Sequence, residues 1–208
     1  MAVTHTPMTA AALREAERLT MLHTPEATLM DRASLAIAAE CKGLSPVALL
    51  VGSGNNGGDA LLAGALLARA GAGVTAVLFT PDAHPRGLAH LTDAGGRVLA
   101  WQQDPQGARS ALRAAAAVID GIVGIGGKPG LRPAAQEAVA EIAATALVVA
   151  VDLPSGLDPD SGDASAPHVT ADVTVTFTAP KACLVDQPAA ASAGKVVLAD
   201  VGVGLLLE

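Results

Sequence analysis

The chain has 208 residues, 51% of them hydrophobic, so it can bury one sizeable core. Thirteen Lys and Arg against 20 Asp and Glu give a net charge of −7, which offers no general attraction to nucleic-acid phosphates or anionic lipid. Aromatic residues make up 1% of the chain and Tyr is absent, which argues against base-stacking surfaces for single strands and excludes a phenol as the acid of a mechanism.

Cysteine and histidine usage also limits the class of protein. Cys41 and Cys183 are too few for a disulfide framework and form no CxxC pair. The five histidines are scattered, which argues against a catalytic zinc site. The N-terminal sequence lacks the pattern of a secretory signal, and no apolar run approaches the ~20 residues of a membrane span. We therefore expect a soluble, cytoplasmic, globular protein.

Helical and strand patterns alternate along the chain. Helices are expected at Met8–Leu22, Ala27–Ala39, Gly57–Ala70, His84–Ala94, Pro105–Ala116 and Pro133–Ala144. Strands are expected at Pro46–Val51, Val74–Phe79, Arg97–Leu99, Ala117–Asp120, Ala146–Val151, Val173–Phe177 and Lys195–Leu198. The strands are nearly all apolar, as in a sheet buried on both faces. The alternation predicts a three-layer α/β/α, Rossmann-like sandwich with a mostly parallel central sheet, in one domain spanning residues 1–208.

Ligands of such folds bind beyond the carboxyl ends of the strands, and the first such end is glycine-rich. Gly52, Gly54 and Gly57 match GxGxxG between a strand and a helix, where free N–H groups attract a phosphate. The motif lacks the GK[ST] ending of a nucleoside-triphosphate loop. Asp59 would repel a phosphate that it faced, so we expect it to contact a hydroxyl, an amide or a cation. The alternative is an Asp that only stabilises the first turn of the helix.

Two further strand ends carry an aspartate. Asp120 precedes a Gly-rich turn that runs to Gly130, and Asp152 precedes a tight turn that presents Ser155. Each could be a simple loop cap or Asx turn, but three such ends on one sheet favour a functional site. Their oxygen ligands suit an alkali or alkaline-earth ion. Ser155 lies in PSG rather than GxSxG, which argues against a serine hydrolase.

Together these motifs resemble the YjeF N-terminal family, the NAD(P)H-hydrate epimerases. The resemblance rests on Gly52–Ala60, Asp120–Gly126, Ala150–Asp158 and Ala179–Lys181, and it extends from about Met8 to Val203. Ala60 replaces the family's usual Gly. The segment Lys128–Arg132 only approximates the family pattern.

The resemblance implies a coenzyme-repair isomerase that interconverts the R and S forms of NADHX and NADPHX, with both hydrates accepted. An S-specific NAD(P)H-hydrate dehydratase, separate or fused, would be its partner. No dehydratase domain is expected within residues 1–208. Independently of the resemblance, the Ala-rich N-terminal helical region could pack against a second copy of the chain and form a homodimer.

The resemblance also implies roles for individual residues. Substrate would be bound by Asn55, Asn56, Gly57, Gly58, Asp59, Gly124, Ile125, Gly126, Gly127, Lys128, Pro129, Gly130 and Asp152. A potassium ion would be held by Asn56, Asp120 and Ser155. Asp152 is the candidate acid–base residue, because a carboxylate would also stabilise a cationic iminium. Lys181 would position Asp152 or a phosphate, or else be a solvated loop lysine.

Two other functions compete with this interpretation. One is an NAD-dependent oxidoreductase, with Asp82 as its ribose-binding acid, which hydride transfer to a carbonyl would reveal. The other is a non-catalytic nucleotide-binding or scaffold domain. Such a domain could lose its polar site groups, yet the chain keeps Asn56, Asp59, Asp120, Asp152 and Ser155.

Overall fold

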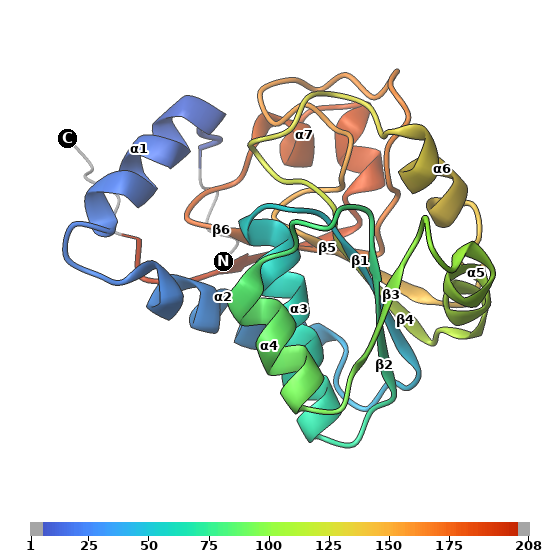
Figure 1. Ribbon diagram of the computed structural model, residues 1–208. Coiled ribbons are helices and arrows are strands. Elements are labelled where there is room, and N and C mark those ends of the chain that lie inside the picture. Colours follow the sequence, from blue (N-terminus) through green and yellow to red (C-terminus); the bar gives the residue numbers. More distant parts are fainter. Residues whose placement is uncertain (1–5, 204–208) are drawn as a thin grey trace.

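A seven-stranded sheet, with every strand parallel to its neighbours, forms the middle layer of the computed structural model, which describes residues 6–203 (Figure 1). Its strands are β1 (Val47–Val51), β2 (Val74–Leu78), β3 (Arg97–Ala100), β4 (Ala117–Gly121), β5 (Leu147–Val151), β6 (Val173–Phe177) and β7 (Lys195–Ala199). The order across the sheet is β3-β2-β1-β4-β5-β6-β7. All seven predicted strands are present, and the predicted mostly parallel sheet is confirmed.

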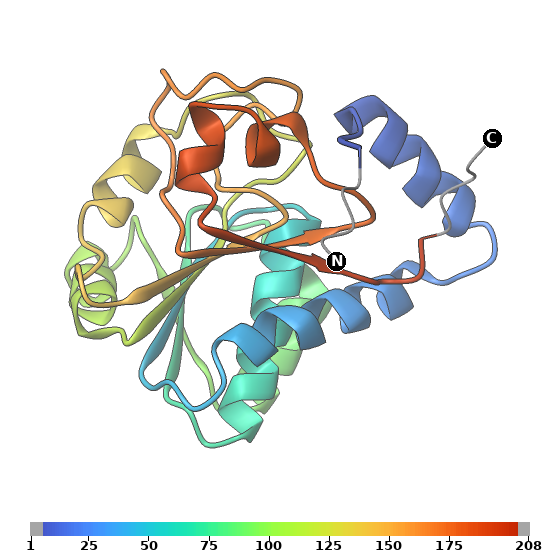
Figure 2. The same ribbon diagram turned by 180° about the vertical axis from the view of Figure 1, so that it is seen from behind.

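Two helical layers cover the sheet, as the sequence predicts (Figures 1 and 2). One face carries α2 (Glu26–Glu40), α3 (Asn55–Arg69) and α4 (Pro85–Asp93), and the other carries α5 (Pro105–Ala114) and α6 (Pro133–Val139). Side chains alternate along each strand. Leu49 of β1 therefore packs under α3, whereas Leu50 packs with Leu112 of α5. Both faces are apolar because both are buried.

The first helix, α1 (Ala10–Thr20), lies apart from these layers (Figure 2). Thr9 caps it by accepting a hydrogen bond from the Ala12 N–H. The backbone N–H of Met8 donates to the Pro180 carbonyl at 2.9 Å, and that of Ala10 to Asp160 Oδ1 at 2.6 Å. These contacts anchor the start of α1 to the loops that follow β5 and β6.

The structure differs from the sequence prediction mainly at helix ends. Helix α3 begins at Asn55, two residues before the predicted start, because Gly54 already has the extended backbone of an N-cap. Helix α6 ends at Val139 rather than Ala144 and continues as turns whose N–H groups bond three residues back. Two short elements were not predicted, α7 (Ala182–Val185) and a 3-10 turn at Ala189–Ser192. Within residues 6–203, no helix combines the length and apolar character needed to cross a membrane.

Candidate functional site

A cavity of about 420 Å³ opens beyond the carboxyl ends of the central strands. Its floor comes from the segments that follow β1, β4 and β5, and its walls come from α1, α2 and the C-terminal segment. The polar side chains in its lining are Arg14, Glu17, Glu26, Ser53, Asn55, Asn56, Asp59 and Asp152. This is the edge of the sheet at which ligands of parallel α/β folds bind.

Helix α3 begins with two asparagines, Asn55 and Asn56, whose side chains are held by hydrogen bonds. A side chain at Gly57 would place a Cβ 2.3 Å from the Gly52 carbonyl oxygen, so the helix starts against the strand end only with glycine there. The Asn55 side-chain amide donates to Glu26 Oε1 at 2.7 Å, and that of Asn56 donates to the Val151 carbonyl at 2.8 Å. The second bond ties the β1 end of the site to its β5 end.

Asp120 and Ser155 meet behind the cavity wall. The hydroxyl of Ser155 donates to Asp120 Oδ1 at 2.6 Å, and its backbone N–H donates to Oδ2 at 2.8 Å. Asp120 is fully buried, and burial raises its pKa to about 6, against the opposing effect of the Ser155 hydrogen bonds. No Lys, Arg or His of the described residues forms an ion pair with Asp120.

Asn56 joins the same cluster through the turn after β4. The Val123 N–H donates to Ser155 Oγ at 3.0 Å, and the next residue, Gly124, lies directly against the Asn56 amide. A Cβ on Gly124 would lie 2.6 Å from Asn56 Oδ1. The fold thus brings Asn56, Asp120 and Ser155 to one turn. A fully buried carboxylate without a cationic side chain, with the Ser155 hydroxyl bonded to it and the Asn56 amide at the same turn, offers oxygen ligands that suit a hard cation such as potassium.

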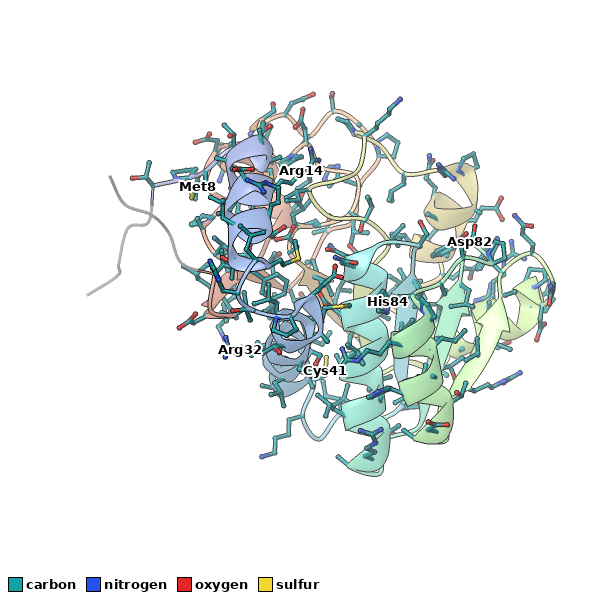
Figure 3. The ribbon with its side chains drawn as sticks, turned by 60° about the vertical axis from the view of Figure 1, so that its left-hand side comes forward. Met8, Arg14, Arg32, Cys41, Asp82 and His84 are labelled. Atoms are coloured by element: carbon teal, nitrogen blue, oxygen red, sulfur yellow. The ribbon has the colours of Figure 1, made fainter. Side chains whose placement is uncertain are left out.

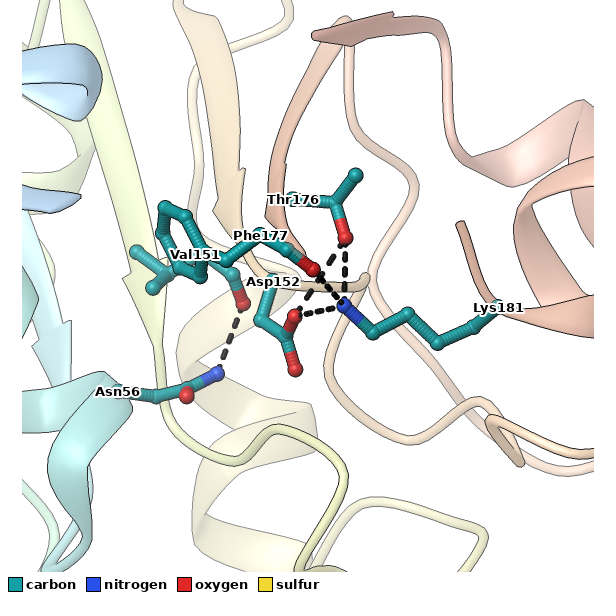
Figure 4. A network of polar contacts seen from close by, with 6 residues as sticks. All are labelled: Asn56, Val151, Asp152, Thr176, Phe177 and Lys181. Carbon is teal, nitrogen blue, oxygen red and sulfur yellow. Dashed lines mark hydrogen bonds and ion pairs between the residues drawn. The ribbon is translucent and has the colours of Figure 1, made fainter. Parts of the chain in front are cut away.

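A buried ion pair joins Asp152 to Lys181 (Figure 4). Lys181 is 1% exposed, and its ammonium donates to Asp152 Oδ1, to Thr176 Oγ1 at 2.7 Å and to the Phe177 carbonyl at 3.2 Å. Lys181 therefore positions Asp152, and the alternative of a solvated loop lysine is wrong. Figure 4 shows the second carboxylate oxygen of Asp152 pointing away from Lys181. Asp152 also has a positive φ of 72°, a left-handed conformation that is uncommon for residues other than glycine, although Asp adopts it more readily than most.

Asp59 is buried against the cavity without a complete set of partners. It is 6% exposed, and its Oδ1 has no hydrogen-bond partner within the described part of the chain. Burial raises the pKa of Asp59 well above its usual value, and the charge of Asp152 raises it further. Asp59 is the fifth residue of α3 and lies outside the first turn, which contains no acidic residue. The alternative of a first-turn helix stabiliser is therefore wrong.

Only some of the predicted substrate-binding residues line the cavity in the structure. Those that do are Asn55, Asn56, Asp59, Gly124, Ile125, Gly126 and Asp152. Outside the lining lie Gly57, Gly58, Gly127, Lys128, Pro129 and Gly130. Asp82, considered above as a ribose-binding acid, follows β2 and is also outside the lining; in Figure 3 it lies well away from Arg14.

Sequence reasoning missed the contribution of the first two helices. Arg14, Glu17 and Met21 recur at spacings of three and four residues, so they share one face of α1, and all three line the cavity. Arg14 Nη2 donates to the Ile125 carbonyl at 2.5 Å. Arg14 is the one Lys or Arg in the lining drawn from residues 6–203. The spacing was visible in the sequence, but polar residues on one helix face usually only meet solvent.

Comparison with known proteins identifies a family. The family model described as "YjeF-related protein N-terminus" matches residues 26–183. The chain is 41% identical over 192 residues to a protein of Clavibacter michiganensis named NAD(P)H-hydrate epimerase, covering 86% of this chain and 84% of that one. It is 36% identical over 206 residues to a protein of the same name from Limosilactobacillus fermentum, covering 95% and 98%.

Longer relatives and one solved structure agree with this. The chain is 41% identical over 205 residues to the bifunctional NAD(P)H-hydrate repair enzyme Nnr of Mycobacterium tuberculosis, covering 93% of this chain. It spans about two fifths of the length of that relative, 41%. The crystal structure of yeast ynu0 (YNL200c) has a TM-score of 0.76 at 22% identity, over 93% of this chain and 87% of that one, which confirms the fold.

Proposed function

The chain belongs to the family of the YjeF-related protein N-terminus, and from this premise we propose that it is an NAD(P)H-hydrate epimerase acting on NADHX and NADPHX. Two relatives that match over most of their own length carry this name. The observation that carries the proposal is the cavity edge itself, where Asp152, held by buried Lys181, and buried Asp59 lie beside the turns that follow β1 and β4.

The reaction needs a proton donor and a cation stabiliser. C6 of the hydrate bears a hydroxyl beside the ring nitrogen. When that hydroxyl leaves with one added proton, as water, the nitrogen lone pair forms a cationic iminium. Water then adds to the opposite face of C6 and gives up a proton, which inverts the centre with no net change in composition. The Asp152 carboxylate, with one oxygen free of Lys181, would stabilise the iminium and accept the proton of the entering water.

The rest of the substrate would extend along the same edge. The turn from Gly124 and the N-terminus of α3 offer backbone N–H groups to the phosphates and ribose, and Arg14 offers a cation at Ile125. We also assign to substrate binding the residues that shape these two turns, which are Gly57, Gly58 and Gly127–Gly130. Four carboxylates in the lining (Glu17, Glu26, Asp59 and Asp152) suit a ring that becomes cationic.

A potassium ion is the proposed cofactor, held by Asn56, Asp120 and Ser155. It would neutralise the buried charge of Asp120 and fix the Val123–Gly124 turn against Asn56. We expect potassium to raise the melting temperature of the wild type, because a ligand that binds only the folded state stabilises it. Asp120→Asn removes the anionic ligand, so its melting temperature should not respond to potassium. Sodium at equal ionic strength is the control.

An S-specific dehydratase, separate or fused, is the proposed partner, since it would consume the S hydrate. The relatives named as bifunctional support this part of the proposal. A single domain over residues 1–208, a cytoplasmic location and a homodimer remain predictions.

The decisive experiment follows purified R and S hydrates by chromatography at neutral pH, with a no-enzyme control because the hydrates interconvert slowly unaided. We expect both isomers to approach one mixture faster with the protein than without it. Asp152→Asn should lower the rate by about a hundredfold or more. Asp158→Asn, in the same loop but outside the cavity lining, is the matched control and should keep the wild-type rate. A wild-type rate equal to the no-enzyme rate would instead favour a binding or scaffold domain.

A further inference from the structure

Asp59 has a second property that substrate binding alone does not explain. Its carboxyl group lines the cavity and is 94% buried (6% exposed), yet Oδ1 has no hydrogen-bond partner in residues 6–203. A buried polar atom without a partner normally costs free energy of folding. Oδ1 itself has almost no accessible surface, whereas Oδ2 also makes no hydrogen bond within residues 6–203, so Oδ2 is the atom that a ligand in the cavity can reach.

The charges that face Asp59 favour its protonated form. Asp152 at the end of β5, Glu17 on α1 and Glu26 on α2 are all acidic. The one opposing charge is Arg86 of α4, whose guanidinium is already paired with Asp31 and donates to the Ala27 carbonyl. Burial and these three carboxylates raise the pKa of Asp59, so the side chain can hold a proton in a cavity that also contains an ion-paired carboxylate.

We propose that Asp59 is the second acid–base residue of the epimerisation, giving its proton to the C6 hydroxyl that leaves from one face of the ring while Asp152 serves the opposite face. This assignment rests on the proposed function. Two carboxyl groups in unlike environments commonly divide acid and base roles in this way.

The proton count balances with this pair. Asp59 begins protonated and Asp152 ionised. As the C6–O bond breaks, the Asp59 proton passes to the leaving oxygen, and water departs. A water molecule then forms a C6–O bond on the other face and passes one proton to Asp152. The pair ends with Asp59 ionised and Asp152 protonated, which is the state needed for the reverse reaction. Exchange of one proton with solvent restores the starting state.

The same placement makes a prediction about stability that separates this role from a structural one. A carboxyl whose pKa is higher in the folded than in the unfolded protein destabilises the fold as pH rises from the usual range of Asp through the raised value. Asp59→Asn keeps the size of the side chain and removes that penalty. We therefore expect a melting temperature at pH 7.5 that is higher than that of the wild type by about 3 °C or more. An Asp with a structural role would give a lower one.

The test measures kcat and KM for both hydrates, and the melting temperature, for the wild type, Asp59→Asn and Asp93→Asn. Asp93 is exposed at the end of α4 and serves as the control, with no expected change. We expect Asp59→Asn to lower kcat by about a hundredfold or more, with KM within about threefold and a raised melting temperature. In the direction in which Asp59 donates, wild-type kcat should fall as pH rises through the raised pKa, and this decline should be absent from the residual activity of Asp59→Asn.

The outcomes separate the two proposals. A wild type that does not accelerate R/S interconversion overturns both. A wild type that does, together with an Asp59→Asn variant of unchanged kcat and pH profile, overturns the role of Asp59 alone. Loss of activity accompanied by a lower melting temperature also overturns it, because Asp59 would then be needed for the fold. Loss of kcat in a folded, more stable variant supports it.

Discussion

Lys181 is among the largest side chains that the fold buries completely, and its charge is balanced by Asp152 and two oxygen acceptors. A buried pair of this kind adds little net stability, because both charges lose water. Its effect is geometric: the ammonium holds Oδ1 of Asp152, and the second carboxylate oxygen points away from Lys181 (Figure 4). The long side chain of lysine lets residue 181, in the loop after β6, reach Asp152 at the end of β5.

Replacing Lys181 by Met should therefore destabilise the protein strongly. The change leaves Asp152 as a buried charge without its partner, which typically costs about 3 to 5 kcal/mol in the free energy of unfolding. The double variant Asp152→Asn/Lys181→Met removes both charges and should recover much of that loss. Urea denaturation of the wild type, both single variants and the double variant measures the coupling between the two residues. Equal stability of Lys181→Met and the wild type would contradict the buried pair.

Short motifs predicted the polar residues at this edge of the sheet. Asn56, Asp152 and Ser155 each follow a strand, and Asp120 lies near the end of β4. Parallel strands bring their carboxyl ends to one edge, so adjacency in space followed from the pattern. The partner of Asp152 was less certain, because Lys181 lies 29 positions away and a single lysine gives no sign of burial. That Asp59 Oδ1 lacks a hydrogen-bond partner could not be predicted, because this depends on how the surrounding helices pack in the folded protein.

At the scale of elements, α1 is the least integrated helix that borders the cavity. It lies outside the two helical layers and is held by hydrogen bonds at its start and by Arg14 at Ile125 (Figures 2 and 3). It also lies outside the residues that the family model matches. Its contribution to the site therefore comes from outside the segment that the family model matches.

If the substrate is a dinucleotide hydrate, Arg14→Gln should weaken its binding. The guanidinium lies beside the Gly124–Gly130 turn, and a charge-assisted hydrogen bond to phosphate is worth roughly 1.5 to 3 kcal/mol, so KM should rise about tenfold or more with kcat little changed. Arg18→Gln is the control from the same helix, because Arg18 is exposed and pairs only with Glu15 among the described residues. An equal rise in KM for both variants would point to the stability of α1 instead.

Element positions were predictable where the hydrophobic period was clear. Most of the seven strands are short, mainly apolar runs with Gly, Pro or Asp nearby, and each was located to within about a residue. Helix α7 has four residues, too few for a 3.6-residue period to show. The end of α6 was misplaced because alanines continue past Val139 and favour a helix, whereas in the structure the backbone there changes to hydrogen bonds three residues back.

At the scale of the whole molecule, the two cysteines report on different parts of the core. Cys41 is buried in the cluster under α2 and α3, and Cys183 in a smaller cluster around Leu153 and Leu184. Burial raises the pKa of both thiols to about 12. The folded protein should therefore resist alkylation by iodoacetamide at pH 8, and both sites should react in denaturant, as measured by mass spectrometry. Labelling of Cys183 alone in the native protein would show that the smaller cluster opens by itself.

The layered architecture followed from the sequence because strands and helices alternate, but the order of strands across the sheet did not. The chain first builds outward from β1 to β3 and then steps back to place β4 on the other side of β1. The pairing of Val51 with Gly121 that results is 70 positions apart in sequence and is set by packing of the whole sheet. Because the strand order reverses between β1 and β4, the loops that follow these two strands run in opposite directions, and the cavity lies between them.

One half of the sheet therefore borders the cavity and the other half does not. Within the described residues, every position in the cavity lining lies before residue 60 or after residue 121, so the segment with β2, α4, β3 and α5 contributes none. Its exposed positions can accept substitutions, short insertions or an attached fluorophore without touching the reacting groups. Surface variation in this half leaves the cavity lining unchanged, and this half therefore offers a suitable place to immobilise the protein.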